Sequence, residues 1–219
     1  MPDLRSLHVT TELFDYIVSH SSVDPIYDRI RDDTLRHSER HAGMQIGADQ
    51  FALLTLLTRL VNARFAVEVG TFTGTSAAAI AKGLAPGGRL LCCDVNEEWT
   101  SIARRNWESA GRSDRIELRL APGLETISAL PPDPGVDLAF LDADKSGYLD
   151  YYEALMPRIR PGGLLIADNT LWSGDVVESG VTGENIDAIR RFNDRVAGDA
   201  RCEVVMLAIG DGVTLCLKR

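Results

Sequence analysis

The chain has 219 residues, a formal net charge of −9 and a sequence pI near 4.9. Hydrophobic residues make up 45% and charged residues 25%, ordinary values for a globular protein, and the length fits a single domain that spans residues 1–219. Because nucleic acids bind to basic surfaces, the acidic balance argues against a nucleic-acid partner.

Residues 1–62 are predicted to form a helical N-terminal cap. The segment TTELFDYIVSH begins with threonine, and DPIYDRIRDDTLRHSER begins with aspartate and proline, which favour the N-cap and first position of a helix. The next segment, ADQFALLTLLTRLVN, is apolar along one helical face.

Residues 63–219 are predicted to form an α/β core. The runs FAVEV, RLLCCD, RIELRL, VDLAFLD and GGLLIADN are mostly apolar, and they are separated by the helical segments SAAAIAKGL, EEWTSIARRNWESA and YLDYYEALMPRI. Continuous apolar strands separated by helices are typical of a parallel sheet that is covered on both faces. After a helix near 184–197, CEVVMLAI and GVTLCLKR are expected to pair antiparallel at one edge of the sheet. The predicted fold is therefore a doubly wound, mostly parallel seven-stranded α/β sheet with an antiparallel C-terminal edge.

The sequence also favours a cytoplasmic protein without membrane contact. Its first residues, MPDLRSLHVTTELF, lack the basic stretch followed by an apolar run that marks an export signal. No apolar run approaches the roughly 18 residues of a membrane helix. The cysteines show no metal-binding spacing, and Cys202 and Cys216, which a C-terminal hairpin could bring together, are no disulfide framework. We expect reduced thiols.

The ends of the first two predicted strands suggest a nucleoside site. Ligands of such sheets bind beyond the carboxyl ends of the strands, where the first strand gives way to Gly70 and the second ends at Asp94. An acidic residue at Asp94 suits the two hydroxyls of a ribose. The turn is not a dinucleotide fingerprint, because Gly70 and Gly74 are four apart and position 72 is Phe, and no phosphate-binding lysine or arginine follows. An ordinary strand-to-helix turn is one interpretation. A ribose site without a phosphate site favours S-adenosylmethionine, whose ammonium group could donate a hydrogen bond to Glu68.

The ends of the fourth and fifth predicted strands suggest a cation site. They carry Asp142 and Asp168-Asn169, and neighbouring strands lie about 4.8 Å apart, so these oxygens could surround one ion. Carboxylate and amide oxygens select a hard divalent cation such as Mg²⁺, Ca²⁺ or Mn²⁺. Asp142 and Asp168 could instead cap the helices that follow. Asp144 would share a strand face with Asp142, which suggests at first that both hold the ion.

Four stretches of the chain, VEVGTFTGTSA, LDADKSGYLDYY, PGGLLIADNTLWSG and GDGVTLCLKR, resemble the cation-dependent class I S-adenosylmethionine O-methyltransferases. This group contains the catechol and caffeoyl-coenzyme A O-methyltransferases, and the chain is more similar to the latter. The resemblance runs from about Gln45 to Arg219 and implies the Rossmann-like methyltransferase fold.

The resemblance implies a role for each motif residue. Metal ligation is implied for Asp142, Asp168 and Asn169, and catalysis for Lys145. Cofactor contacts, with Asp94 at the ribose and Ala121 at the adenine, are implied for Met44, Glu68, Gly70, Thr71, Ser76, Asp94, Ala121, Asp142 and Asp144. Asp144 thus becomes a cofactor contact and not a second metal ligand. The substrate would contact Lys145, Trp172 and Ser173, the last of which stands where the family often has asparagine.

Some of these residues also have purely structural interpretations. Met44 and Trp172 could be core residues, and Lys145 could be a solvated surface charge. Tyr148, Tyr151 and Tyr152 are predicted to pack within a helix. His37 and His41 lie four apart but lack the acidic partner of a zinc motif.

The function that the sequence favours is methyl transfer from S-adenosylmethionine to one hydroxyl of a vicinal-dihydroxy aromatic small molecule. A divalent cation would lower the pKa of the phenol, which is about 10 in the tyrosine model, and Lys145 would take its proton. An NAD-dependent oxidoreductase shares the sheet, but the fingerprint is absent. A non-catalytic cofactor-binding scaffold is a second alternative, against which the intact set of Asp142, Lys145 and Asp168 argues. The resemblance and the apolar faces of the N-terminal helices also imply a homodimer.

Overall fold

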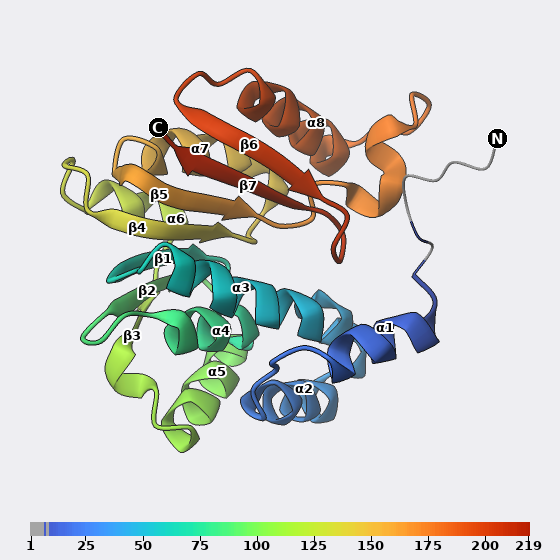
Figure 1. Cartoon of the computed structure of the whole chain (residues 1–219), viewed down its shortest axis with the longest axis vertical. Helices are drawn as coiled ribbons and strands as arrows, with labels where there is room; N and C mark the ends of the chain where they lie inside the picture. Colours follow the sequence, from blue (N-terminus) through green and yellow to red (C-terminus); the bar gives the residue numbers. More distant parts are fainter. Residues whose placement is uncertain (1–6, 8) are drawn as a thin grey trace.

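One seven-stranded sheet forms the centre of the computed structural model, which describes residue 7 and residues 9–219 (Figure 1). The strand order is β3-β2-β1-β4-β5-β7-β6. Strands β1 to β5 pair in parallel, whereas β7 is antiparallel to both β5 and β6. The strands are β1 Phe65–Val69, β2 Arg89–Asp94, β3 Ile116–Leu120, β4 Val136–Leu141, β5 Ile159–Ala167, β6 Cys202–Leu207 and β7 Val213–Lys218. This arrangement confirms the predicted fold class.

Helices cover both faces of the sheet. The α-helices are α1 Thr11–Ser19, α2 Ile26–His37, α3 Ala48–Leu60, α4 Thr75–Gly83, α5 Glu97–Ser109, α6 Gly123–Ser128, α7 Tyr148–Leu155 and α8 Glu184–Ala197. Four short 3₁₀ helices connect them: η1 Glu39–Met44, η2 Ser113–Arg115, η3 Lys145–Gly147 and η4 Trp172–Val177.

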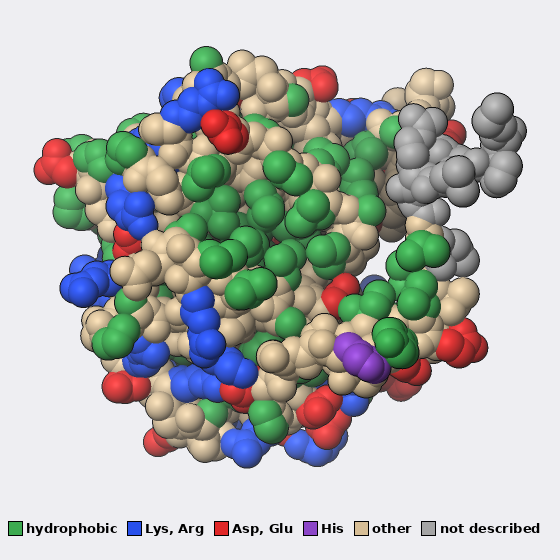
Figure 2. All heavy atoms as spheres, in the orientation of Figure 1, with side chains coloured by type: hydrophobic (Ala, Val, Ile, Leu, Met, Phe, Trp, Pro, Cys, Tyr) green, Lys and Arg blue, Asp and Glu red, His purple; other side chains and the backbone are tan. Residues whose placement is uncertain are grey.

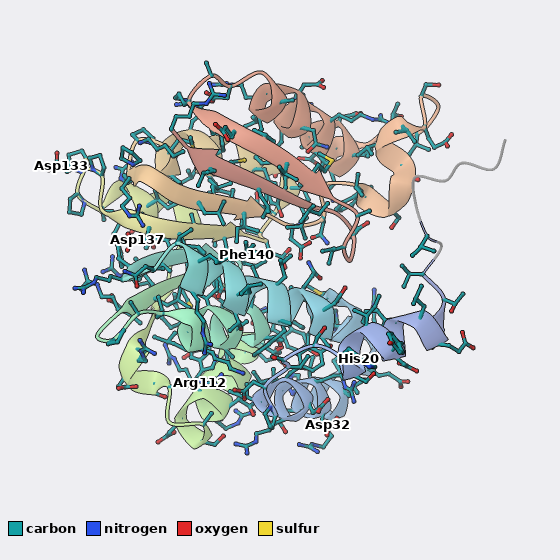
Figure 3. All side chains as sticks on the ribbon, in the orientation of Figure 1. His20, Asp32, Arg112, Asp133, Asp137 and Phe140 are labelled. Carbon is teal, nitrogen blue, oxygen red and sulfur yellow. The ribbon has the colours of Figure 1, made fainter. Side chains whose placement is uncertain are left out.

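Strand alternation divides the interior into two hydrophobic cores. Ala66 and Phe140 face one core with residues of α2, α3, α4 and α5, and Figure 3 shows Phe140 on the α3 side of the sheet. Val67 and Leu141, their neighbours along the chain, face the other core with residues of α6, α7 and α8. Because successive strand residues point to opposite faces, an apolar run without polar interruptions is what such a doubly covered strand requires.

The two ends of the sheet have different roles. At the amino-terminal ends of the parallel strands, Asp137 Oδ2 accepts hydrogen bonds from the backbone N–H groups of Arg64 (2.7 Å) and Phe65 (2.8 Å) and so fixes the start of β1 (Figure 3). At the carboxyl ends, Asp94, Asp142 and Asp168 lie at or just beyond the last residues of β2, β4 and β5. The candidate site is therefore at the end of the sheet opposite to Asp137.

Several element boundaries differ from the prediction for local reasons. Helix α2 begins at Ile26, one residue later than predicted, but Asp24 still caps it, because Asp24 Oδ1 accepts from the Ile26 N–H at 3.0 Å. Helix α7 ends at Leu155, two residues before Pro157, which cannot continue a helix. Helix α6 is short and was not predicted.

Two expectations from the sequence concern the cysteines, expected as reduced thiols, and membrane-spanning segments. All four cysteines are buried and unpaired. Within residues 7 and 9–219, none of the helices has the length and hydropathy needed to cross a bilayer.

Candidate active site

A cavity of about 850 Å³ lies at the carboxyl ends of the parallel strands. Its size falls within the range of sites that enclose cofactors and small molecules. The segment 43–47 forms part of one wall, and Gly210 and Asp211 of the β6–β7 hairpin form part of another. Five aspartates line the cavity, together with the single cation Lys145: Asp94, Asp142, Asp144, Asp168 and Asp211. The negative lining favours cationic ligands.

The glycine-rich turn after β1 is held by Asp94. Asp94 Oδ2 accepts hydrogen bonds from the backbone N–H groups of Thr71 and Phe72, both at 2.9 Å. Gly70 has φ +90°, and a Cβ atom at that position would lie 2.1 Å from the carbonyl oxygen of Asp142. Glycine is therefore required here by the close approach of the chain's own backbone. Gly70 and Asp94 both line the cavity, as predicted for cofactor contacts.

An aromatic wall closes the same end of the cavity. The rings of Phe72 and Trp99 both line it, and their centroids lie 4.8 Å apart. His37 and His41 pack against Trp99 with centroid distances of 5.0 and 5.1 Å. The two histidines thus support an aromatic side chain, and His37 Nε2 also lies 2.8 Å from Glu98 Oε1. Trp99 was not predicted as a site residue, because its position beside the strand ends depends on the packing of α5.

Glu68 is buried behind this wall. Its side chain is inaccessible to solvent, and neither carboxylate oxygen has a hydrogen-bond partner of good geometry among the described residues. Burial raises the pKa of Glu68 to about 8, while the nearby polar groups of Ser76 and Thr71 lower it. Glu68, Thr71 and Ser76 are buried and do not line the cavity. Their roles as cofactor contacts stay predictions. The other predicted cofactor residues line the cavity directly, including Met44, which is 58% exposed and therefore not a core residue, and Ala121.

The predicted metal ligands lie together at the other end of the cavity. Strands β4 and β5 are paired in parallel, and the backbone N–H of Asp168 donates to the carbonyl of Leu141 at 3.0 Å, so Asp142 and Asp168 follow neighbouring strand ends. Burial, together with the charge of Asp168, raises the pKa of Asp142 to about 7, although the neighbouring Lys145 lowers it. Burial also raises the pKa of Asp168. Asn169, with φ +53°, turns away from the strand and lines the cavity beside them.

This donor set fits a hard cation. Two carboxylates that burial and mutual repulsion destabilise gain most from a positive charge placed between them. Among the described residues, no three His, Cys, Asp or Glu side chains form a cluster that could hold a metal, so the fit depends on the Asn169 amide as the third donor. Neither aspartate serves mainly as a helix cap: Asp142 Oδ1 accepts from the Lys145 Nζ, and Asp168 is buried against Gln50.

Lys145 is not a solvated surface charge. It is 8% exposed, and its Nζ donates to Asp142 Oδ1 at 3.1 Å and to the Tyr148 hydroxyl oxygen at 2.6 Å. The Tyr148 hydroxyl in turn lies 3.2 Å from the Leu141 carbonyl oxygen and 3.1 Å from that of Asp168. Lys145 is thus fixed at the cavity wall beside the predicted metal ligands.

The Asp144 carboxylate is bound by the helical turns that follow it. It caps η3 through a hydrogen bond from the Gly147 N–H to Oδ2 at 3.0 Å, and its Oδ1 accepts from the Tyr151 hydroxyl at 2.6 Å. The first interpretation from the strand pattern, that Asp142 and Asp144 share one ion, is wrong because the chain leaves the strand after Leu141. Tyr148 and Tyr152 pack in the core as predicted, whereas Tyr151 also lines the cavity.

Two loops meet at the remaining side of the site. The N–H groups of Thr170 and Leu171 donate to the carbonyls of Gly212 and Asp211, both at 3.0 Å. Ser173 donates its N–H to Asp211 Oδ1, is exposed, and does not line the cavity. Trp172 lines the cavity and also packs against the core, and its contact with a substrate stays a prediction. Asp211 was not predicted as a site residue, although it belongs to the quoted GDGVTLCLKR stretch.

Several known proteins are similar to this chain in sequence and in fold. Residues 18–219 match the family described as O-methyltransferase. The chain is 35% identical over 231 residues to caffeoyl-CoA O-methyltransferase 2 from Zea mays, covering 98% of this chain and 85% of that protein. It is 35% identical over 210 residues to catechol O-methyltransferase domain-containing protein 1 from Mus musculus, covering 94% of this chain and 79% of that protein. The O-methyltransferase from Bacillus cereus, solved in complex with SAH, aligns with a TM-score of 0.85 at 27% identity, covering 95% of this chain and 98% of that one.

The fold and the cavity define an α/β enzyme whose site lies at the switch point of a parallel sheet. The chain belongs to the O-methyltransferase family. This membership confirms the resemblance to class I S-adenosylmethionine O-methyltransferases that the four sequence stretches indicate.

Proposed function

We propose that the protein uses S-adenosylmethionine and a divalent cation to methylate one hydroxyl of a catechol-type small molecule. One observation carries the proposal: a single cavity joins Asp94, suited to ribose hydroxyls, to the half-buried Asp142 and the buried Asp168. The nucleoside cofactor and the acceptor can therefore meet inside one enclosure, which is what direct group transfer requires.

The cofactor end supports S-adenosylmethionine. Asp94 lies beside the tight turn at Gly70, and the aromatic wall of Phe72 and Trp99 gives an apolar surface next to it. The cofactor carries a sulfonium and an ammonium group, and the negative lining favours both. The similar B. cereus enzyme was solved in complex with SAH.

Asp142, Asp168 and Asn169 would hold the cation, most suitably Mg²⁺, with Ca²⁺ and Mn²⁺ also compatible with oxygen donors. When bound, the cation stabilises negative charge on the acceptor oxygen and lowers the pKa of the hydroxyl. Three protein donors are fewer than a full octahedral set, so the two hydroxyls of a vicinal diol can supply further ligands. The arrangement therefore favours a catechol over a lone phenol.

Lys145 would receive the acceptor's proton. Its Nζ is held by Asp142 and Tyr148 at the cavity wall, so its position is fixed before the acceptor enters. The acceptor oxygen would attack the methyl carbon, with a C–O bond forming as the C–S bond breaks and S-adenosylhomocysteine as the leaving group. The proton would pass from the hydroxyl to the Nζ of Lys145 in its neutral form, since an ammonium group cannot accept one, and then to solvent.

Steady-state kinetics on matched catechol and phenol pairs test the proposal, with products resolved by mass spectrometry. We expect kcat/KM at least tenfold higher for each catechol, loss of turnover in EDTA, and recovery with Mg²⁺ or Mn²⁺. Lys145→Met should lower kcat by about 100-fold or more while the KM for the diol changes little, because proton transfer contributes to the transition state.

Three results would contradict the proposal at different points. Equal kcat/KM for both members of several pairs would exclude chelation of a diol. Full activity in a thoroughly chelated sample would exclude the cation. The oxidoreductase alternative would be favoured if calorimetry showed binding of NAD but not of S-adenosylhomocysteine and no methylated product formed. The non-catalytic scaffold would be favoured if the protein bound S-adenosylhomocysteine but turned over no acceptor.

A further inference from the structure

The carboxylate of Asp168 is held asymmetrically. Its Oδ1 atom accepts two hydrogen bonds, from the Asn169 N–H at 2.7 Å and from the Gln50 Nε2 at 3.0 Å. No described residue donates a hydrogen bond to its Oδ2 atom at good geometry. The residue is 3% exposed, so the carboxylate exchanges few hydrogen bonds with bulk water. One oxygen is thus committed to the protein, and the other is left for a ligand in the cavity.

The Gln50 amide is itself fixed in one orientation. Gln50 lies in the first turn of α3 and is 5% exposed. Its Oε1 accepts from the backbone N–H of Gly47 at 3.2 Å, and because an amide oxygen cannot donate, the Nε2 group must be the end that faces Asp168. Both polar ends of the amide therefore have partners that define its direction.

The β6–β7 hairpin closes the remaining side of this amide. A Cβ atom placed on Gly210, which has φ +55°, would lie 2.6 Å from Gln50 Oε1. The hairpin backbone therefore lies directly against the Gln50 side chain. Gln50 is confined by α3, by the end of β5 and by the hairpin, and it has little room for another rotamer.

We propose that Gln50 is a positioning residue that orients the Asp168 carboxylate so that Oδ2 is its cation-binding atom. The inference rests on the proposed function, because it concerns the cation that Asp168 would hold. A carboxylate free to rotate about its last bond must be ordered each time an ion binds, whereas the Gln50 hydrogen bond orders it beforehand. A neutral amide does this without changing the charge of the site. Partners of this kind behind a metal ligand typically change metal affinity by about 10- to 100-fold.

A pair of variants on α3 tests the role. Gln50→Met removes the amide but keeps a side chain of similar length that fills the same space. Thr55→Val is the matched control, since Thr55 is also buried on α3 and also loses one side-chain hydrogen bond, from its Oγ1 to the Ala79 carbonyl at 3.0 Å. The Thr55 hydroxyl contacts the backbone of α4 and not the candidate site.

The readout is the dissociation constant for Mn²⁺ alone, measured by electron paramagnetic resonance of free Mn²⁺ and by calorimetry, with no acceptor present. We expect Gln50→Met to bind Mn²⁺ at least tenfold more weakly, and Thr55→Val to stay within twofold of wild type. In turnover assays Gln50→Met should need more Mn²⁺ for half-maximal rate but reach a kcat close to wild type at saturation. A general loss of structure would instead affect both variants and would lower kcat at every concentration.

The same Mn²⁺ affinity for wild type and Gln50→Met would overturn the inference. A wild-type protein that binds no Mn²⁺ at millimolar concentration would overturn the cation of the proposed function instead, so the two failures are distinguishable. If Gln50→Met does not fold, Gly210→Ala is the second variant, because its added methyl group would clash with the Gln50 amide from the hairpin side. It should weaken Mn²⁺ binding in the same direction, and unchanged affinity in that variant would overturn the inference.

Discussion

At the scale of single residues, the most unusual feature is an isolated carboxyl group inside the protein. Glu68 is inaccessible to solvent, and its oxygens lack hydrogen-bond partners of good geometry among the described residues. Burial raises its pKa from 4.5 to about 8, so the neutral form is favoured in the folded protein at neutral pH. Such a group destabilises the protein wherever the unfolded chain would ionise it, and natural proteins keep such groups mainly at functional sites.

Glu68→Gln should therefore stabilise the cofactor-free protein at neutral pH. The unfolded chain loses the Glu68 proton near pH 4.5, whereas the folded protein retains it up to about pH 8. Stability due to this group is thus complete below pH 4.5, falls as the pH rises toward 8 and levels off above that value. We expect the variant to gain on the order of 2–3 kcal/mol in unfolding free energy at pH 7 and to lose this advantage near pH 4.5. Urea unfolding of both proteins from pH 4.5 to 8 measures the difference, and parallel curves would contradict it.

The residues that sequence predicts and those it misses differ in how far apart their partners lie. Asp94, Asp142 and Lys145 follow strand ends, and the carboxyl ends of parallel strands meet at one edge of a sheet, so their proximity could be inferred. Gln50 contacts Asp168 across 118 positions of sequence, and no local pattern marks a buried glutamine as a partner of a distant aspartate. In the sequence Tyr151 looks like an ordinary helix residue, and its hydrogen bond to Asp144 becomes apparent only in the folded structure.

At the scale of elements, one charged residue joins three of them on the α8 side of the sheet. The Asp199 side chain is 3% exposed, and its Oδ2 accepts from the Tyr152 hydroxyl of α7 at 2.9 Å. The same carboxylate forms ion pairs with Arg195 of α8 at 2.9 Å and with Arg201, just before β6, at 2.6 Å. Hydrogen bonds from Arg201 and from the Tyr152 hydroxyl hold the pKa of Asp199 well below its usual value. The cluster thus fixes the connection from α8 to β6.

Asp199→Asn should loosen this connection without touching the active site. We expect a loss of about 2 kcal/mol in unfolding free energy at pH 7. The substitution replaces the charged hydrogen bonds that the Asp199 carboxylate accepts with weaker neutral ones, and some of them are lost. The Asp199 contribution is present above its ordinary pKa of 3.8 and is lost as the pH falls, so the gap between variant and wild type should narrow in acid. Thermal unfolding at pH 7 and at about pH 3, below the ordinary pKa of the carboxyl group, measures the gap. Asp133→Asn, which changes an exposed residue in the loop before β4, is the control and should have little effect (Figure 3).

Helices and strands were predicted well where their hydrophobic pattern is strong, and poorly where the element is too short to show a pattern. The apolar runs of β1, β2 and β4 stand out because both of their faces are buried. Helix α6 has only six residues, too few for an amphipathic period to show, and it begins at Gly123. Gly123 is nevertheless important locally, because a Cβ there would lie 2.5 Å from a methyl carbon of Val69. Short helices that tertiary packing stabilises leave little signal in a single sequence.

At the scale of the whole molecule, the net charge of −9 excludes partners more readily than it identifies them. Total charge cannot reveal that five aspartates face one cavity, because that concentration follows from where strands end. The apolar content, like the net charge, says nothing about where the residues lie in the structure. It predicts a sizeable core, but it does not show which apolar side chains remain outside it.

Five of the exposed apolar side chains lie on one face of the molecule. Figure 2 shows hydrophobic side chains spread across the region of β6, β7 and α3, and the exposed apolar residues of these elements are Leu56, Leu60, Val205, Met206 and Leu217. Strand β6 is also the edge of the sheet, paired only with β7 among the described strands. A contiguous apolar face beside an exposed strand edge is unusual for a monomer, because it invites association.

We propose that two copies of the chain bury this face against each other as a homodimer. A twofold interface brings the same patch of each copy together, so one apolar face is sufficient for both partners. Light scattering at micromolar concentration should give twice the chain mass of 23.9 kDa. Leu56→Glu should shift the protein toward the monomer, since a charge on this face would be desolvated in the interface. Leu120→Glu, at the end of β3 on the opposite edge of the sheet, should leave the dimer intact. A wild-type mass equal to one chain would contradict the homodimer, and equal dissociation by both variants would show that another face forms it.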